Sequence, residues 1–83
     1  MGLEQTMEDC ARRGITVLLK VDHERQDDGG EPWTVLMSGP GVGAAGAFIR
    51  AEAATMSEAV NECLHRLAEL PGDWSWLHGP VSE

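Results

Sequence analysis

The sequence predicts a small α+β domain in the order α-β-β-β-α, with helices packed on one face of a three-stranded antiparallel sheet. Apolar residues alternate at period two between residues 15 and 22, which is typical of a strand with one buried face. Between residues 56 and 70 they recur at intervals of three and four, which is typical of an amphipathic helix. A chain of 83 residues suits one such unit, so we expect a single domain over residues 1–83.

The first predicted element is a short helix over residues 3–13. Its apolar residues share one side of the helix: Leu3, Met7, Cys10 and Ala11. Acidic residues fall in its earlier turns, and Arg12 and Arg13 fall in its last turn, so both charge placements favour the helix dipole. Gly14 then provides a natural C-terminal stop.

Two strands joined by a polar loop are predicted next. Residues 15–22 form the clearest strand, because β-branched residues dominate it and its odd-numbered residues are apolar. Residues 33–37 form a second strand with its odd-numbered residues on one face. The intervening residues 23–32 are polar, so we expect a loop that projects into solvent at the tip of a hairpin.

The segment over residues 47–54 fits either a strand or a helix. Its alanines favour a helix, whereas its alternation of apolar and charged residues favours a strand. A capping-box pattern, with Thr55 as the N-cap and Glu58 three residues later, predicts that the next helix begins at Met56. Since that start leaves residues 47–54 outside the helix, we predict a third strand.

The longest predicted helix spans residues 56–70. Its apolar stripe consists of Met56, Ala59, Val60, Cys63, Leu64 and Leu67. On its polar side, Glu62 and Arg66 form a favourable i,i+4 pair. Pro71 and Gly72 end the helix, and residues 73–83 form a tail that carries two tryptophans.

The chain is strongly acidic, with 14 Asp and Glu against 6 Lys and Arg and a formal net charge of −8. Because phosphate backbones attract basic surfaces, direct binding to nucleic acid is disfavoured, and a charged protein partner should be basic. The acidity also serves solubility by itself. No apolar run approaches the roughly 20 residues that span a bilayer, so we expect no membrane contact.

The two cysteines, Cys10 and Cys63, fall on the apolar sides of the predicted helices. Two cysteines do not make a disulfide framework. We therefore expect two reduced thiols in a hydrophobic core, which is typical of a cytoplasmic protein.

Two groups of residues are candidates for contact with a protein partner. Asp27, Asp28 and Glu31 belong to the acidic hairpin tip and suit a basic partner. Trp74 and Trp76 are large apolar side chains of a type enriched at binding hot spots. The alternative is that one or both tryptophans fold back over the core, because a small domain needs its large apolar side chains inside.

We predict no catalytic site, metal site or cofactor. Gly41–Gly46 matches the pattern G-x-G-x-x-G of dinucleotide sites, but no long βαβ unit fits in the remaining chain. A hairpin loop is therefore the favoured interpretation of these glycines. The acidic loop lacks the EF-hand spacing, and the His and Cys spacing does not resemble a zinc site.

Residues 15–70 resemble the HicB-type antitoxin domain, which has a β-β-β-α core with a partial RNase H-like fold. The family places a threonine before the helix and Glu-Ala in its first turn, as in Thr55 and Glu58-Ala59. Pro40-Gly41 stands where the family often has Pro-Gly near the end of its second strand. The resemblance implies an antitoxin that neutralises a small basic ribonuclease.

These features predict a small acidic module that acts by docking to a protein partner, without catalysis. A HicB-like antitoxin is the first alternative, and nucleotide binding through the Gly41–Gly46 loop is the second. An exposed sheet edge is also a route to a homodimer.

Overall fold

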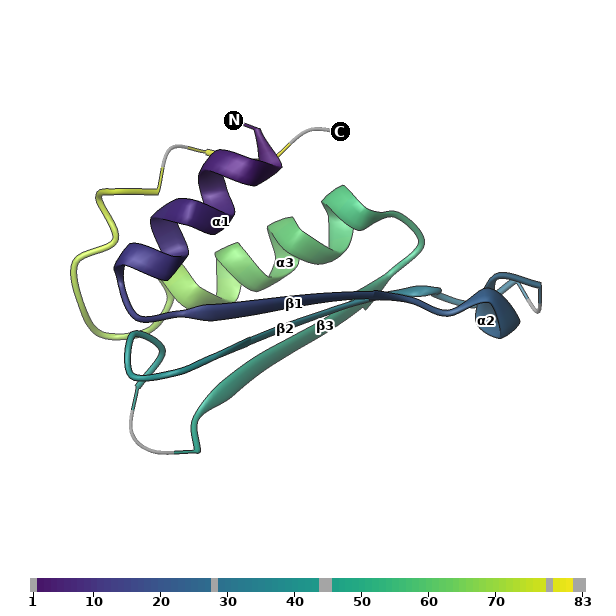
Figure 1. The fold of residues 1–83 in the computed structure, drawn as a ribbon, viewed down its shortest axis with the longest axis horizontal. Helices are drawn as coiled ribbons and strands as arrows, with labels where there is room; N and C mark the ends of the chain where they lie inside the picture. The colour runs from purple at the N-terminus through teal and green to yellow at the C-terminus, as the bar shows by residue number, and fades with distance from the viewer. Residues whose placement is uncertain (1, 28, 44–45, 78, 82–83) are drawn as a thin grey trace.

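The computed structural model describes residues 2–27, 29–43, 46–77 and 79–81 (Figure 1). Its helices and strands are α1 (Leu3–Arg12), β1 (Thr16–Val21), α2 (His23–Asp27), β2 (Trp33–Ser38), β3 (Phe48–Ala53) and α3 (Met56–Ala68). The α+β class and the predicted order of three strands between two helices are confirmed, with α2 as an addition.

The three strands form one antiparallel sheet in the order β1-β2-β3. In its register, Leu18 of β1 lies opposite Leu36 of β2, which in turn lies opposite Arg50 of β3. The ambiguous segment is therefore a strand, because β3 pairs with β2 over all six of its residues. Consecutive strands are neighbours, as hairpin connections require.

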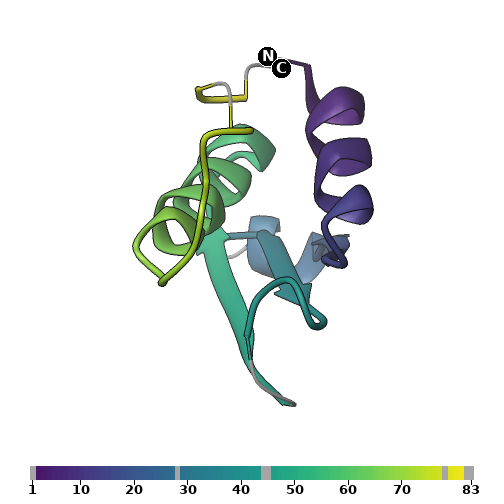
Figure 2. The ribbon, with the colours of Figure 1, turned by 90° about the vertical axis from the view of Figure 1, so that its left-hand side faces the viewer.

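Both long helices lie on the same face of the sheet, and no described helix covers the other face (Figures 1 and 2). The helix α3 packs on β2 and β3, whereas α1 packs on β1. Figure 2 shows the two helices on opposite sides of this face, with α3 on one side and α1 on the other. The odd-numbered residues of the strands face the helices, and the even-numbered residues form what we call the open face.

The hydrophobic core lies between the sheet and the two long helices, and α3 contributes most of its helical residues. Its largest fully buried side chains are Met37, Leu67, Val35, Val60, Cys10 and Cys63. The predicted apolar stripe of the long helix is thus confirmed, with Met56 half-buried at its start. The predicted face of β1 is covered less completely, because Val17 and Leu19 are half-buried and Val21 is 51% exposed.

The helix boundaries follow local hydrogen bonds. The Thr55 side chain accepts a hydrogen bond from the Glu58 backbone N–H at 3.2 Å, which confirms the predicted N-cap. The Glu62–Arg66 pair is also present at 3.1 Å. Gly14 follows the C-terminal end of α1 and has φ +77°, a left-handed conformation that favours glycine.

The prediction of a loop over residues 23–32 is wrong for the first half of this range, where α2 forms. The Asp22 carboxylate accepts a hydrogen bond from the Glu24 N–H at 3.0 Å and so supports the start of this helix. Arg25 then reaches back to Glu52 of β3. The hairpin that carries α2 nevertheless projects away from the body, as expected (Figure 1).

Candidate functional site

The main candidate is an apolar patch on the open face of the sheet. The register places Leu18 opposite Leu36, and Phe48 one diagonal step from Leu36. Diagonal neighbours in a sheet lie within reach of large side chains. Leu18 is 57% exposed, Phe48 is 63% exposed and Leu36 is half-buried. These three side chains therefore form one patch across all three strands.

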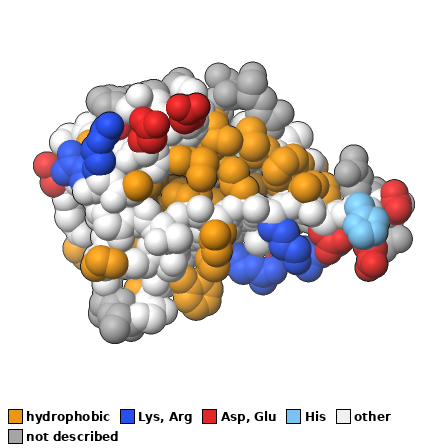
Figure 3. Space-filling view, viewed as in Figure 1, with side chains coloured by type: hydrophobic (Ala, Val, Ile, Leu, Met, Phe, Trp, Pro, Cys, Tyr) orange, Lys and Arg blue, Asp and Glu red, His pale blue; other side chains and the backbone are white. Residues whose placement is uncertain are grey.

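Charged side chains border this patch on the open face. Lys20 lies two residues along β1 from Leu18. Arg50 Nη2 lies 3.3 Å from Glu52 Oε1, and Arg25 contacts the same carboxylate. In Figure 3, hydrophobic and Lys or Arg side chains lie together on the side of the sheet away from the helices. The open face therefore combines an apolar centre with basic groups, in a chain whose net charge is −8.

The predicted acidic contact lies on the projecting hairpin. Asp27 and Glu31 are exposed there, and Asp28 lies outside the described residues. Figure 1 shows this hairpin at one end of the molecule and the tail with Trp74 and Trp76 at the other. The structure therefore does not bring the two predicted contact groups together.

The two tryptophans fold back on the molecule, which matches the alternative stated for them. Both are half-buried and pack against the core. The Trp74 indole N–H donates to the Leu70 carbonyl oxygen at 2.7 Å, and the two ring centroids are 6.0 Å apart. The Arg13 guanidinium lies 5.4 Å from the Trp76 ring centroid, in cation–π range. Their contact with a partner stays a prediction.

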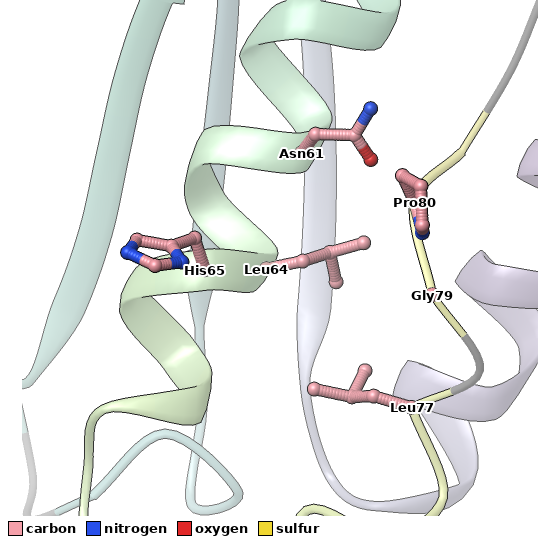
Figure 4. Close-up of a pocket in the computed structure, with 6 residues that line it drawn as sticks. All are labelled: Asn61, Leu64, His65, Leu77, Gly79 and Pro80. Atoms are coloured by element: carbon pink, nitrogen blue, oxygen red, sulfur yellow. The ribbon is translucent and has the colours of Figure 1, made fainter.

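A small pocket of about 220 Å³ lies between α3 and the tail (Figure 4). It is lined by Asn61, Leu64, His65, Leu77, Gly79 and Pro80. Asn61 and Leu64 point toward the tail, whereas His65 points away from it. The Asn61 carboxamide donates to the Val81 carbonyl oxygen at 2.9 Å and accepts from the Val81 N–H at 2.6 Å. Its polar atoms thus anchor the tail, and Val81 is buried beside it.

The two cysteines are free thiols, and both are fully buried. Burial raises the pKa of Cys63 to about 11, although the Arg66 charge opposes this shift. Burial, with a smaller contribution from Asp9, also raises the pKa of Cys10. The Cys63 thiol donates to the Val35 carbonyl oxygen at 3.6 Å. Since the thiolate is the reactive form, both thiols suit a core role, as the sequence predicted.

The glycine-rich stretch joins two antiparallel strands, and its residues 44–45 lie outside the described part. Gly41 packs tightly on the junction between α1 and β1. Its N–H donates to the Gly14 carbonyl oxygen at 3.0 Å, and an added Cβ would collide with the Arg13 carbonyl oxygen. Close backbone approach thus accounts for this glycine, and the strand-to-helix context of a dinucleotide site is not seen here.

Among the described residues, no group of three or more His, Cys, Asp or Glu side chains is placed to hold a metal ion. In the same part of the chain, no helix has the length and apolar character needed to cross a bilayer. Comparisons of the chain with protein-family models, with curated proteins and with solved structures found no match. The likeness to HicB-type antitoxins therefore stays a prediction.

Proposed function

We propose that this chain is a non-catalytic interaction module that docks to a protein partner through the open face of its sheet. The supporting observation is the patch of Leu18, Leu36 and Phe48, which no described helix covers. Apolar surface gains about 25 cal/mol per Å² when it leaves water. A partner that covers these side chains therefore gains affinity without any rearrangement of the sheet.

The charges near the patch define the chemistry of the partner further. The acidic hairpin projects from one end of the sheet and presents Asp27 and Glu31 to solvent. A partner matches this arrangement if its surface has an apolar centre, acidic groups opposite Lys20 beside the patch, and a basic flank opposite the hairpin. The net charge of −8 also steers basic proteins toward the module.

The test substitutes one exposed residue of the patch. Phe48→Glu places a charge in the proposed contact, and Ala68→Glu places the same charge on the exposed side of α3 as the matched control. A partner protein from the native host should bind the wild-type chain and Ala68→Glu equally well. Its affinity for Phe48→Glu should be at least tenfold lower. Circular dichroism verifies that both variants fold.

Two outcomes would contradict this proposal. Binding that survives in Phe48→Glu places the contact elsewhere. Binding that survives in Phe48→Glu but is lost when Asp27 and Glu31 are replaced by Lys places it on the acidic hairpin.

The antitoxin hypothesis is a narrower form of the same proposal. It is supported by the order β1-β2-β3-α3 and by the Thr55 cap before the helix. Under this hypothesis the partner is a small basic ribonuclease, whose RNA cleavage the module suppresses when the two are mixed. Unchanged cleavage by every small basic neighbour of the gene would exclude the antitoxin role and leave the docking proposal standing.

A further inference from the structure

The outer edge of β1 carries unpaired backbone groups. The Asp22 N–H donates to the Pro32 carbonyl oxygen at 2.9 Å, one step beyond the last pair of the β1–β2 ladder. Hydrogen-bonded and non-hydrogen-bonded pairs alternate in an antiparallel ladder, so the even-numbered residues of β1 bond to β2. The backbone N–H and C=O groups that point away from the sheet are those of Val17, Leu19 and Val21.

The outer edge of β3 is protected, in contrast. By the same alternation, its even-numbered residues turn their backbone groups outward. The Arg66 guanidinium of α3 donates to the outward Arg50 carbonyl oxygen at 2.6 Å. Arg50 and Glu52 also place charged side chains along this edge, a common device against strand pairing. Among the described contacts, none reaches an outward backbone group of β1, and the one charged side chain of this strand is Lys20.

Apolar side chains lie directly above the β1 edge, on the helix side. Val21 is 51% exposed, and Val17 and Leu19 are half-buried. Leu3 and Met7 of α1 are half-buried above them. Figure 3, which looks onto this edge, shows a continuous hydrophobic area between α1 and β1. The free backbone groups and the apolar surface therefore occupy the same side of the molecule.

We propose that two copies of this chain pair through β1, antiparallel and centred on Leu19, to form a continuous six-stranded sheet. In this register Leu19 faces Leu19 of the second copy, and Val17 faces its Val21. Both contacts lie on the helix side and join the two hydrophobic areas. On the open face, Leu18 faces Lys20 of the second copy, so no like charges oppose each other.

The charges at the ends of this seam explain why a second copy fits. β1 ends at Val21 and α2 begins at His23, so in this register the start of α2 lies near the N-terminal end of the second copy's β1, which follows Arg12 and Arg13 in the chain. The acidic hairpin of each copy would thus lie on the side of the other copy that carries Arg12 and Arg13, which contact Asp9 and Trp76 within their own chain. This local match offsets the repulsion between two chains of net charge −8.

The size of the interface sets a further requirement. Stable interfaces bury about 800 Å² on each partner. This is about one sixth of the 5082 Å² surface of one chain. The strand edge alone is too small for that area, so the exposed surface of α1 and the hairpin around α2 must also contribute.

The test has two parts: a measurement of the mass in solution and a comparison of two oppositely charged variants at Leu18. Analytical ultracentrifugation of the wild-type chain should give twice the 9.0 kDa chain mass. Leu18→Lys places two like-charged pairs with Lys20 of the second copy in each dimer. Leu18→Glu places two oppositely charged pairs at the same positions. Because Leu18 is 57% exposed, both variants should fold. The dimer dissociation constant of the Lys variant should exceed that of the Glu variant about tenfold at low salt.

Three results would overturn this inference. The first is a wild-type chain that sediments as a monomer at several hundred micromolar. The second is equal dimer stability in the Lys and Glu variants, because it would exclude the β1 register. The third is dissociation by Phe48→Glu, since Phe48 lies away from the seam and its effect would assign the contact to the open face. A dimer that survives Phe48→Glu separates self-pairing from partner docking.

Discussion

The β1 side and the β3 side of the sheet each carry one long helix, yet they are packed differently. On the β3 side, α3 buries residues such as Leu67 completely, and Arg66 covers a carbonyl group of the strand edge. On the β1 side, α1 leaves Val21 51% exposed and the strand edge unpaired. An 83-residue chain has little apolar surface to bury, so we infer that the β3 side supplies most of the stability and the β1 side is free for contacts.

The largest expected effect compares one leucine from each side. Leu67→Ala removes a fully buried side chain of α3 and should cost about 2–5 kcal/mol. Leu19→Ala removes a half-buried one from β1 and should cost about 1 kcal/mol. Urea unfolding at low protein concentration measures both values on the monomer. Equal losses would show that the two sides contribute equally to stability.

A second test uses alkaline pH and concerns Cys63, a buried residue of α3 whose thiol donates to Val35 of β2. Its pKa is raised from 9.0 to about 11 in the folded chain, so the unfolded chain loses this proton first. The Cys63 thiol therefore contributes about 2–3 kcal/mol to the free energy of unfolding below pH 9. This contribution is lost as the pH rises toward 11. The chain has no Tyr, so few other groups titrate in this range.

The matched variant for this test is Cys63→Ala. Its unfolding free energy, measured at pH 8.5 and 10.5, should fall less than that of the wild-type chain. The remaining fall belongs in part to Cys10, whose pKa is also raised by burial. An unchanged pH dependence in Cys63→Ala would refute this assignment.

The smallest expected effect compares the starts of the two helices. Thr55→Ala removes the side-chain cap of α3 and should cost about 1 kcal/mol. Gly2, the N-cap residue of α1, makes no side-chain bond, so Gly2→Ser should change stability by only a few tenths of a kcal/mol. Thermal unfolding followed by circular dichroism measures both, and a larger effect at Gly2 would reverse the comparison.

The elements that the sequence predicted well are those with local signals. Periodicity and the Thr55 cap located α3, and the same cap separated it from β3. The helix α2 was missed because it has no apolar face and depends on the Asp22 cap and on Arg25 contacts with Glu52. A five-residue helix held by a distant strand leaves no periodic pattern in the sequence.

The candidate site could not be predicted because it depends on register. Leu18 lies on the face of β1 opposite the predicted apolar face, and only strand pairing brings Leu36 and Phe48 beside it. The positions of the tryptophans depend on distant contacts in the same way. Arg13 lies over Trp76 although the two are far apart in the chain, and no local pattern indicates that contact.

The bonds between Asn61 and Val81 close a ring of about 20 residues by non-covalent contacts alone. Residues 61–68 of this ring belong to α3, so only about 12 residues are flexible, and closing a loop of that length costs about 2 kcal/mol in chain entropy. Two hydrogen bonds contribute about 1–3 kcal/mol, and burial of Val81 adds about 1.5–3 kcal/mol. Trp74 and Trp76 hold the first part of the tail separately, so we expect the contact between Val81 and Asn61 to open more readily than the molecule unfolds, and each opening exposes the pocket beside Leu64.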